Sequence, residues 1–153
     1  GIRCLYLGDT AETTIYEARD GAYDYVTVGK FRLKEDIIVV DLKKINQISP
    51  FIEGLDCLEY AINKEHLNKI NDEMGKIMRR SDSALDYVPT QYITDFVKSI
   101  IRDGKAEYAG IEYKSVMHSG GYNLALFDPD LFECIGTEVY GIDTIDYRKH
   151  PIV

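Results

Sequence analysis

The residue types that can do chemistry gather, in this amino-acid sequence, where strands and helices are expected to end. Residues 4–7 read as a short buried strand, Gly8 and Asp9 interrupt it, and a helix carrying Glu17 follows. Tyr6 therefore lies at the end of a strand, and Glu17 lies about two turns into the next helix. A phenol and a carboxylate close to one strand-to-helix turn can bind a polar ligand. The full set of candidates at such positions is Tyr6, Glu17, Gln91, Tyr113, Ser115 and Asn123.

Each candidate also has an ordinary structural explanation. Glu17 could be a surface charge, Ser115 a turn residue, Asn123 a cap and Gln91 a solvent-facing residue of a first helical turn. For any single residue the structural explanation is the more common one. Composition and periodicity alone indicate an acidic α+β domain and no particular activity.

The start of the first helix has a clear capping signal. Asp9 is a good N-cap residue, and Glu12 follows it by three positions, which predicts a capping box. The sequence therefore places the strand end and the helix start within a few residues of each other.

Composition limits the classes of partner. The chain has 153 residues, 45% hydrophobic and 29% charged, as expected for one soluble globular domain. Its net charge of −8 argues against a nucleic-acid partner, which would require a basic face. No apolar run approaches the ~20 residues of a membrane span, and no signal peptide is recognisable, so we expect a cytoplasmic protein without a membrane contact.

The sequence gives little support for a metal site or for a catalytic nucleophile. Cys4, Cys57 and Cys134 are widely spaced, and the histidines form no ligand pair, so we expect reduced thiols and no metal site. Cys4 lies in an apolar strand, where a thiol acts as a small hydrophobic group. Ser115, His118 and an aspartate could form a hydrolytic triad, but the GxSxG elbow is absent.

The remaining periodicities predict mixed or antiparallel sheets with flanking helices. Residues 23–33 alternate as a half-buried strand, and the apolar run 37–42 is typical of a central strand, joined to the first as an antiparallel hairpin. Helical spacing covers much of 43–85, and a further helix starts either after Thr90 as its cap or with Pro89 in its first turn. Later strands are expected at 110–115, 122–127 and 133–147.

Four blocks of the sequence together resemble the RES domain family, which is named for an arginine, a glutamate and a serine. The segment LYLGDTAETTIYEAR resembles the family's first motif, and VTVGKFRLKEDIIVVDL resembles its strand pair ending in Asp-Leu. YVPTQYITDFV is similar to its later helix, and GIEYKSVMHSGGYNLALFDP to its last motif. The blocks occur in the family's order and cover most of the chain outside 43–86.

The resemblance implies an ADP-ribosyltransferase-like fold that binds NAD in a cleft. It implies a toxin that degrades NAD by hydrolysis or phosphorolysis, with NAD as substrate rather than cofactor, and a partner antitoxin. The family glutamate falls on Glu17, the serine on Ser115 and the motif tyrosine on Tyr6. Gln91, Tyr113 and Asn123 match further family positions, and Arg19 is a candidate to offset the charge of NAD.

In this interpretation residues 1–153 form a single RES-like domain that lacks its first strand and the family arginine, which lies upstream of Tyr6. Glu17 is expected to stabilise the cationic ribose that forms when the nicotinamide–ribose bond breaks, and Ser115 to hydrogen-bond the nicotinamide side. Tyr6 is expected to stack on the nicotinamide or hold the ribose. Two alternatives stay open: a protein ADP-ribosyltransferase, or a catalytically silent module that binds NAD or a partner.

Overall fold

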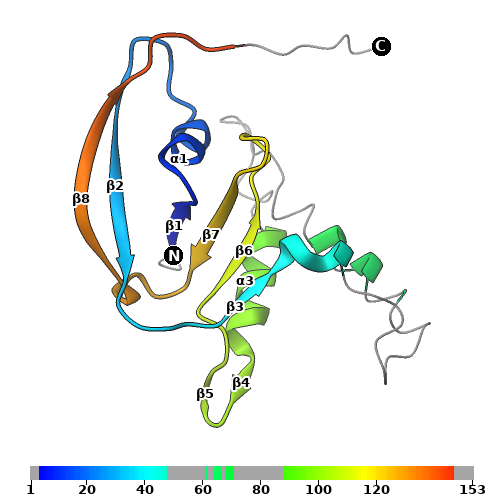
Figure 1. Ribbon diagram of the computed structural model, residues 1–153. Coiled ribbons are helices and arrows are strands. Elements are labelled where there is room, and N and C mark those ends of the chain that lie inside the picture. Colours follow the sequence, from blue (N-terminus) through cyan, green and yellow to red (C-terminus); the bar gives the residue numbers. More distant parts are fainter. Residues whose placement is uncertain (1–3, 48–60, 62–63, 67, 71–87, 147–153) are drawn as a thin grey trace, which may run out of the picture.

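A computed structural model of the chain describes residues 4–47, 61, 64–66, 68–70 and 88–146 (Figure 1). The described part contains helices with parallel and antiparallel strand pairs, so the chain is of the α+β class that the sequence predicts. Most of the helical pattern expected at 43–85 lies outside the described residues. Residues 61, 64–66 and 68–70 within it are helical.

The centre of the described fold is a four-stranded sheet in the order β1-β7-β6-β3. Its strands are β1 (Leu5–Gly8), β7 (Tyr122–Leu126), β6 (Gly110–Lys114) and β3 (Val39–Asp41). β7 pairs antiparallel with both β1 and β6, whereas β3 pairs parallel with β6. The first strand of the chain therefore lies beside one of the last, which brings distant segments to one sheet face.

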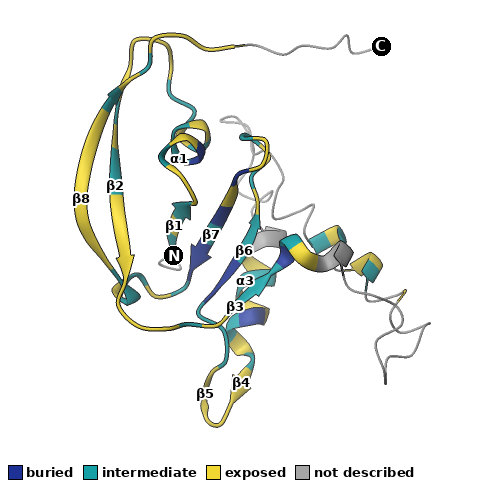
Figure 2. Cartoon of the chain, in the orientation of Figure 1, coloured by how far each residue is buried: buried dark blue, intermediate teal, exposed yellow. Residues whose placement is uncertain are grey.

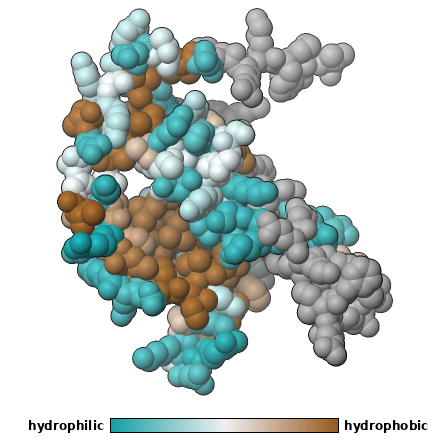
Figure 3. Space-filling model, in the orientation of Figure 1, coloured by the Kyte–Doolittle hydropathy of each residue, from teal (hydrophilic) through white to brown (hydrophobic). Residues whose placement is uncertain are grey.

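A separate ribbon pairs β2 (Tyr25–Leu33) with β8 (Phe132–Gly141). The ribbon contains an irregularity between Lys30 and Phe31, as expected for a β-bulge. In Figure 1 the ribbon curves beside the central sheet, with the first helix next to it. Figure 3 shows hydrophobic side chains gathered over β7 and β6 beside this ribbon.

The expected hairpin between residues 23–33 and 37–42 is wrong. β2 pairs with β8, which is of similar length, and the second run forms only the three-residue edge strand β3. Residue Leu42 leaves the strand to begin a 3-10 helix, η1 (Leu42–Gln47), and is buried there, while Ile38 is exposed. The apolar run is thus divided among a loop, an edge strand and a helical turn rather than being buried on both faces.

The buried core lies where α3 (Val88–Ser99) and η1 pack against β6. Leu42, Val97 and Ile111 form its centre, and Ile111 is completely buried. Figure 2 shows the buried positions concentrated on β6 and β7. Pro89 lies in the first turn of α3 and Thr90 lies inside the helix, so the second of the two expected helix starts is correct.

After α3 comes a small hairpin of β4 (Ile101–Arg102) and β5 (Lys105–Ala106). Asp103 and Gly104 form its turn with φ values of 53° and 78°, a conformation that Asp-Gly pairs favour in two-residue hairpins. Within the described residues, no helix is long and apolar enough to cross a membrane.

The first helix, α1 (Ala11–Ala18), begins one residue later than the sequence predicts. Thr10 is the N-cap, and its hydroxyl accepts the N–H of Thr13 at 3.0 Å. Asp9 instead continues the pairing of β1 with β7, because its N–H donates to Tyr122 at 3.0 Å and its carboxylate accepts the Tyr122 N–H at 3.3 Å. The expected capping box of Asp9 with Glu12 is therefore wrong.

Candidate functional site

The candidate site is built around the carboxylate of Glu17 on α1. Oε1 of Glu17 accepts one hydrogen bond from the Ser115 hydroxyl and one from the Asn123 side-chain amide, both at 2.7 Å. The two donors are 98 and 106 residues away along the chain. Both bonds fall on Oε1, so these two donors leave Oε2 of Glu17 unused.

The loop after β6 orients Ser115. Oγ of Ser115 accepts hydrogen bonds from the backbone N–H groups of Met117 at 3.2 Å and His118 at 3.0 Å. With both of these bonds on the oxygen, the hydroxyl proton is left to donate to Glu17. The backbone of Ser115 also donates to Gly121 at 2.9 Å, which closes the loop at the start of β7.

Strand register places the other polar groups on the same sheet face. Asn123 is opposite Tyr113 on one side and opposite Gly8 on the other, while Tyr6 is opposite Ala125. Side chains alternate along a strand, so Tyr6, Tyr113 and Asn123 share one face. Asn123 is buried, and Tyr6 is 67% exposed.

These residues line a cavity of about 250 Å³. Its walls are Tyr6, Leu7, Gly8, Thr14, Glu17, Tyr113 and Asn123. The cavity therefore combines one carboxylate, one amide and two phenols on an otherwise uncharged surface. Such a lining suits a small ligand with an aromatic ring and hydroxyl groups.

The Tyr113 phenol lines this cavity and has a raised pKa. Burial raises the pKa of Tyr113 above its usual range, and the neighbouring Tyr6 and Glu17 raise it further. The phenol is consequently neutral at every physiological pH. Glu17 is then the one acidic side chain among the residues that line the cavity.

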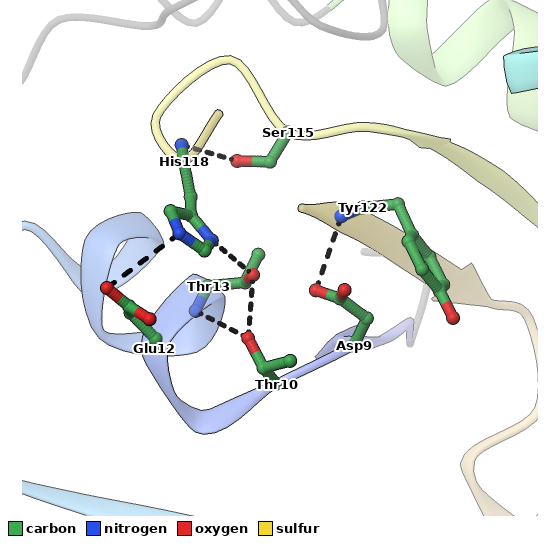
Figure 4. Close-up of polar contacts among 7 residues, drawn as sticks. All are labelled: Asp9, Thr10, Glu12, Thr13, Ser115, His118 and Tyr122. Carbon is green, nitrogen blue, oxygen red and sulfur yellow. Dashed lines mark hydrogen bonds and ion pairs between the residues drawn. The ribbon is translucent and has the colours of Figure 1, made fainter. Parts of the chain in front are cut away.

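A second cluster attaches the Ser115 loop to α1 (Figure 4). Nδ1 of His118 is 2.8 Å from the Thr13 hydroxyl, which in turn is 2.9 Å from the hydroxyl of Thr10. The imidazole stacks on Tyr16, with ring centroids 5.1 Å apart and planes 8° from parallel. Nε2 of His118 is 3.8 Å from Oε1 of Glu12.

The structure places some of the site residues predicted from the sequence at the cavity and others away from it. The residues that line the cavity or contact Glu17 are Tyr6, Glu17, Tyr113, Ser115 and Asn123. Gln91 is exposed on α3, and Arg19 caps the end of α1 with φ 56°; neither lines the cavity. The sequence analysis missed Thr13, whose only signal is that it precedes Glu17 by one helical turn, and the anchoring contacts of His118.

The hydrolytic triad is not formed by the residues that suggested it. The Ser115 hydroxyl donates to Glu17, and the nearest partners of the His118 ring are Thr13, Tyr16 and Glu12 rather than Ser115 Oγ. Cys4 is partly buried, Cys134 is exposed, and both are free thiols, while Cys57 lies outside the described residues. Within the described part of the chain, no three His, Cys, Asp or Glu side chains are grouped to hold a metal.

A larger hollow of about 550 Å³ lies at the other end of the sheet. It is open and is bordered by the segment before β3, by β5 and by the end of α3, with Ile38, Tyr108 and Phe127 among its walls. None of the sequence-predicted site residues borders it. Its larger size alone therefore does not make it a better candidate for the functional site than the smaller cavity beside Glu17.

Comparison with known proteins gives one result. The model of the RES domain family matches residues 1–146, which is nearly the whole chain. Neither the curated proteins nor the solved structures contain a match to the chain. Because the family model spans nearly the whole sequence, the chain belongs to the RES domain family.

Proposed function

We propose that this protein degrades NAD by cleaving the bond between nicotinamide and ribose. The observation that carries the proposal is the Glu17 carboxylate, held through Oε1 by Ser115 and Asn123 beside a cavity with two phenols. Pockets for drug-sized ligands measure about 300–1,000 Å³, so a cavity of about 250 Å³ suits one nucleoside half of NAD rather than the whole dinucleotide. The nicotinamide riboside half is the half that reacts.

The chemistry needs a negative charge close to the ribose. When the C1′–N1 bond breaks, its electron pair leaves with nicotinamide, which becomes neutral, and positive charge develops on the ribose. A fixed carboxylate stabilises that charge because it is oriented before the reaction begins. We assign this role to Oε2 of Glu17, and we assign the exposed Tyr6 to stacking on the nicotinamide ring.

The acceptor completes the reaction in one of two ways. Water attacking C1′ gives ADP-ribose and releases one proton. Phosphate attacking C1′ gives ADP-ribose 1″-phosphate. Both reactions are consistent with the proposed role of Glu17, since the same cationic ribose precedes the attack.

The geometry suggests a different role for Ser115 from the one expected. Its hydroxyl proton is directed at Glu17 and its oxygen accepts two backbone N–H groups. We therefore propose that Ser115 orients Glu17 instead of hydrogen-bonding nicotinamide. Asn123 acts on the same oxygen from the opposite strand.

The test is an NAD-consumption assay on the full-length protein, with products separated in the presence and absence of phosphate. Glu17→Gln keeps the shape of the side chain and should lower the rate by about 10²–10³, the usual loss for one electrostatic group. Glu35→Gln removes an exposed carboxylate from the larger hollow and serves as the matched control. Unchanged NAD consumption by Glu17→Gln would refute the assignment.

The same assay separates the rival functions. Labelled NAD that ends on protein would indicate a protein ADP-ribosyltransferase, and NAD that binds without loss would indicate a silent binding module. For the toxin role, and for action in the cytoplasm where NAD is abundant, we expect induced expression to deplete cellular NAD and arrest growth. Co-expression of an antitoxin should restore growth, and Glu17→Gln should make the antitoxin unnecessary.

A further inference from the structure

The loop of residues 115–121 between β6 and β7 is attached to α1 by two parallel bridges. In the first, Ser115 donates to Glu17 at 2.7 Å. In the second, His118 bonds to Thr13 at 2.8 Å through Nδ1. Thr13 and Glu17 are four residues apart, so they lie one above the other on the same face of the helix. Ser115 and His118 are three residues apart and are joined by the bond from the His118 N–H to Ser115 Oγ.

The His118 bridge is firmly built. Thr13 is completely buried, and the imidazole is stacked on Tyr16 of the same helix. Gly121, at the other end of the loop, packs so closely that a Cβ there would overlap Thr13 Oγ1 and come within 2.9 Å of His118 Nδ1. The loop therefore cannot shift along the helix without breaking several contacts.

We infer that His118 is a positioning residue for the Glu17 site: its Nδ1 bond to Thr13 fixes the loop on α1 and so holds the Ser115 hydroxyl against the Glu17 carboxylate. The inference rests on the proposed function for its catalytic consequence. Its structural part rests on the contacts of His118 with Thr13 and Ser115 (Figure 4) and on the contact of Ser115 with Glu17. His118 acts through Ser115 and does not touch the proposed substrate.

Two substitutions of His118 distinguish the role of its Nδ1 hydrogen bond from the role of the rest of the imidazole ring. Asparagine places an amide near the position of Nδ1, whereas glutamine places its amide near Nε2. His118→Gln should therefore lower kcat by about 10–100-fold, as is usual when the partner of a functional group is lost, while KM stays near its wild-type value. His118→Asn should recover most of that loss. His66→Gln, on an exposed helical position, is the control for removing a histidine.

A second pair tests the other end of the bond. Thr13→Val removes the hydroxyl at nearly constant volume and should lower kcat as His118→Gln does. The double variant should be no slower than the slower single variant, because both substitutions break the same bond. Wild-type kcat in His118→Gln, equal losses in His118→Asn and His118→Gln, or fully additive losses in the double variant would overturn the inference.

A readout without NAD makes the outcome independent of the proposed function. The amide protons of Met117 and His118, which donate to Ser115 Oγ, should exchange with solvent faster in His118→Gln and Thr13→Val than in wild type. Wild-type exchange rates in both variants would overturn the positioning role even if NAD is consumed. If wild type consumes no NAD, the proposed function fails, and the exchange measurement still decides whether His118 holds the loop.

Discussion

The Ser115 hydroxyl and the Glu17 carboxylate are 2.7 Å apart, although 98 residues of chain separate them. Glu17 lies on α1, and Ser115 directly follows β6. The contact exists because β7 lies between β1 and β6 and brings both segments to one face. Several predictions about activity and stability depend on this pair and its neighbours.

Ser115→Ala should impair catalysis more than binding. Removing the hydroxyl leaves Glu17 with one donor, so the carboxylate is held less firmly while the cavity keeps its volume. We expect kcat for NAD loss to fall about 10–100-fold with little change in KM. Ser119→Ala, at an exposed position of the same loop, is the control. Equal kinetics for the two alanine variants would show that the hydroxyl has no role.

Asn123→Asp should destabilise the protein in a pH-dependent way. The substitution replaces a buried donor with a second carboxylate next to Glu17, which should cost about 1–3 kcal/mol of unfolding free energy at neutral pH. A shared proton relieves the repulsion, so the deficit should shrink as the pH falls towards 5. Urea unfolding of the variant and wild type at both pH values measures the difference.

The double variant Glu17→Gln/Asn123→Asp provides the decisive comparison for this pair. It exchanges donor and acceptor, so the amide of residue 17 can donate to the new carboxylate. Stability should return partway towards wild type, because the two carboxylates no longer repel each other while the Ser115 hydroxyl loses its acceptor on residue 17. NAD consumption should stay as low as in Glu17→Gln. A double variant as unstable as Asn123→Asp would show that the hydrogen bond does not explain the loss.

Tyr113→Phe should change the alkaline limit of stability. Because burial raises the pKa of Tyr113, the unfolded chain loses this proton near pH ~10 while the folded protein retains it. The unfolding free energy is unaffected below that pH and falls as the pH rises above it, since the unfolded state then binds fewer protons. The phenylalanine variant should lose less stability between pH 9 and 11 in urea unfolding. Parallel curves for the two proteins would contradict the expected shift.

Gly121→Ala should destabilise the loop that carries Ser115. The new Cβ overlaps Thr13 Oγ1, and overpacking of this kind costs about 1–3 kcal/mol. We also expect slower NAD consumption, because Ser115 N–H donates to the carbonyl of Gly121. Gly136→Ala, where no atom lies within 4 Å of the added Cβ, is the control and should be nearly neutral. Thermal unfolding compares the two variants directly.

Local patterns were sufficient to predict several elements. The alternation at residues 23–33 and the turn after residue 127 correspond to β2 and the end of β7, and the strand-to-helix unit at residues 5–18 is present. Pairing between distant strands was not predictable. The run at 37–42 is as apolar as a central strand, but among the described strands β3 pairs only with β6, far along the chain, and is therefore an edge strand.

The candidate site, too, was only partly predictable from the sequence. Residue types and family motifs identified Glu17, Ser115, Tyr6, Tyr113 and Asn123, which the structure brings together. The roles of all these residues towards NAD stay predictions, and Gln91 and Arg19 are not among the residues that line the cavity. The N-cap was misassigned because Asp9 and Thr10 have similar capping preferences, and only the pairing of Asp9 with Tyr122 decides between them.

The order β1-β7-β6 has a consequence for when activity can arise during synthesis. Glu17 emerges from the ribosome about a hundred residues before its two donors. A nascent chain that has not reached β7 holds the carboxylate without the groups that orient it. Under the proposed function, a polypeptide that has not reached β7 should therefore leave the cellular NAD pool untouched.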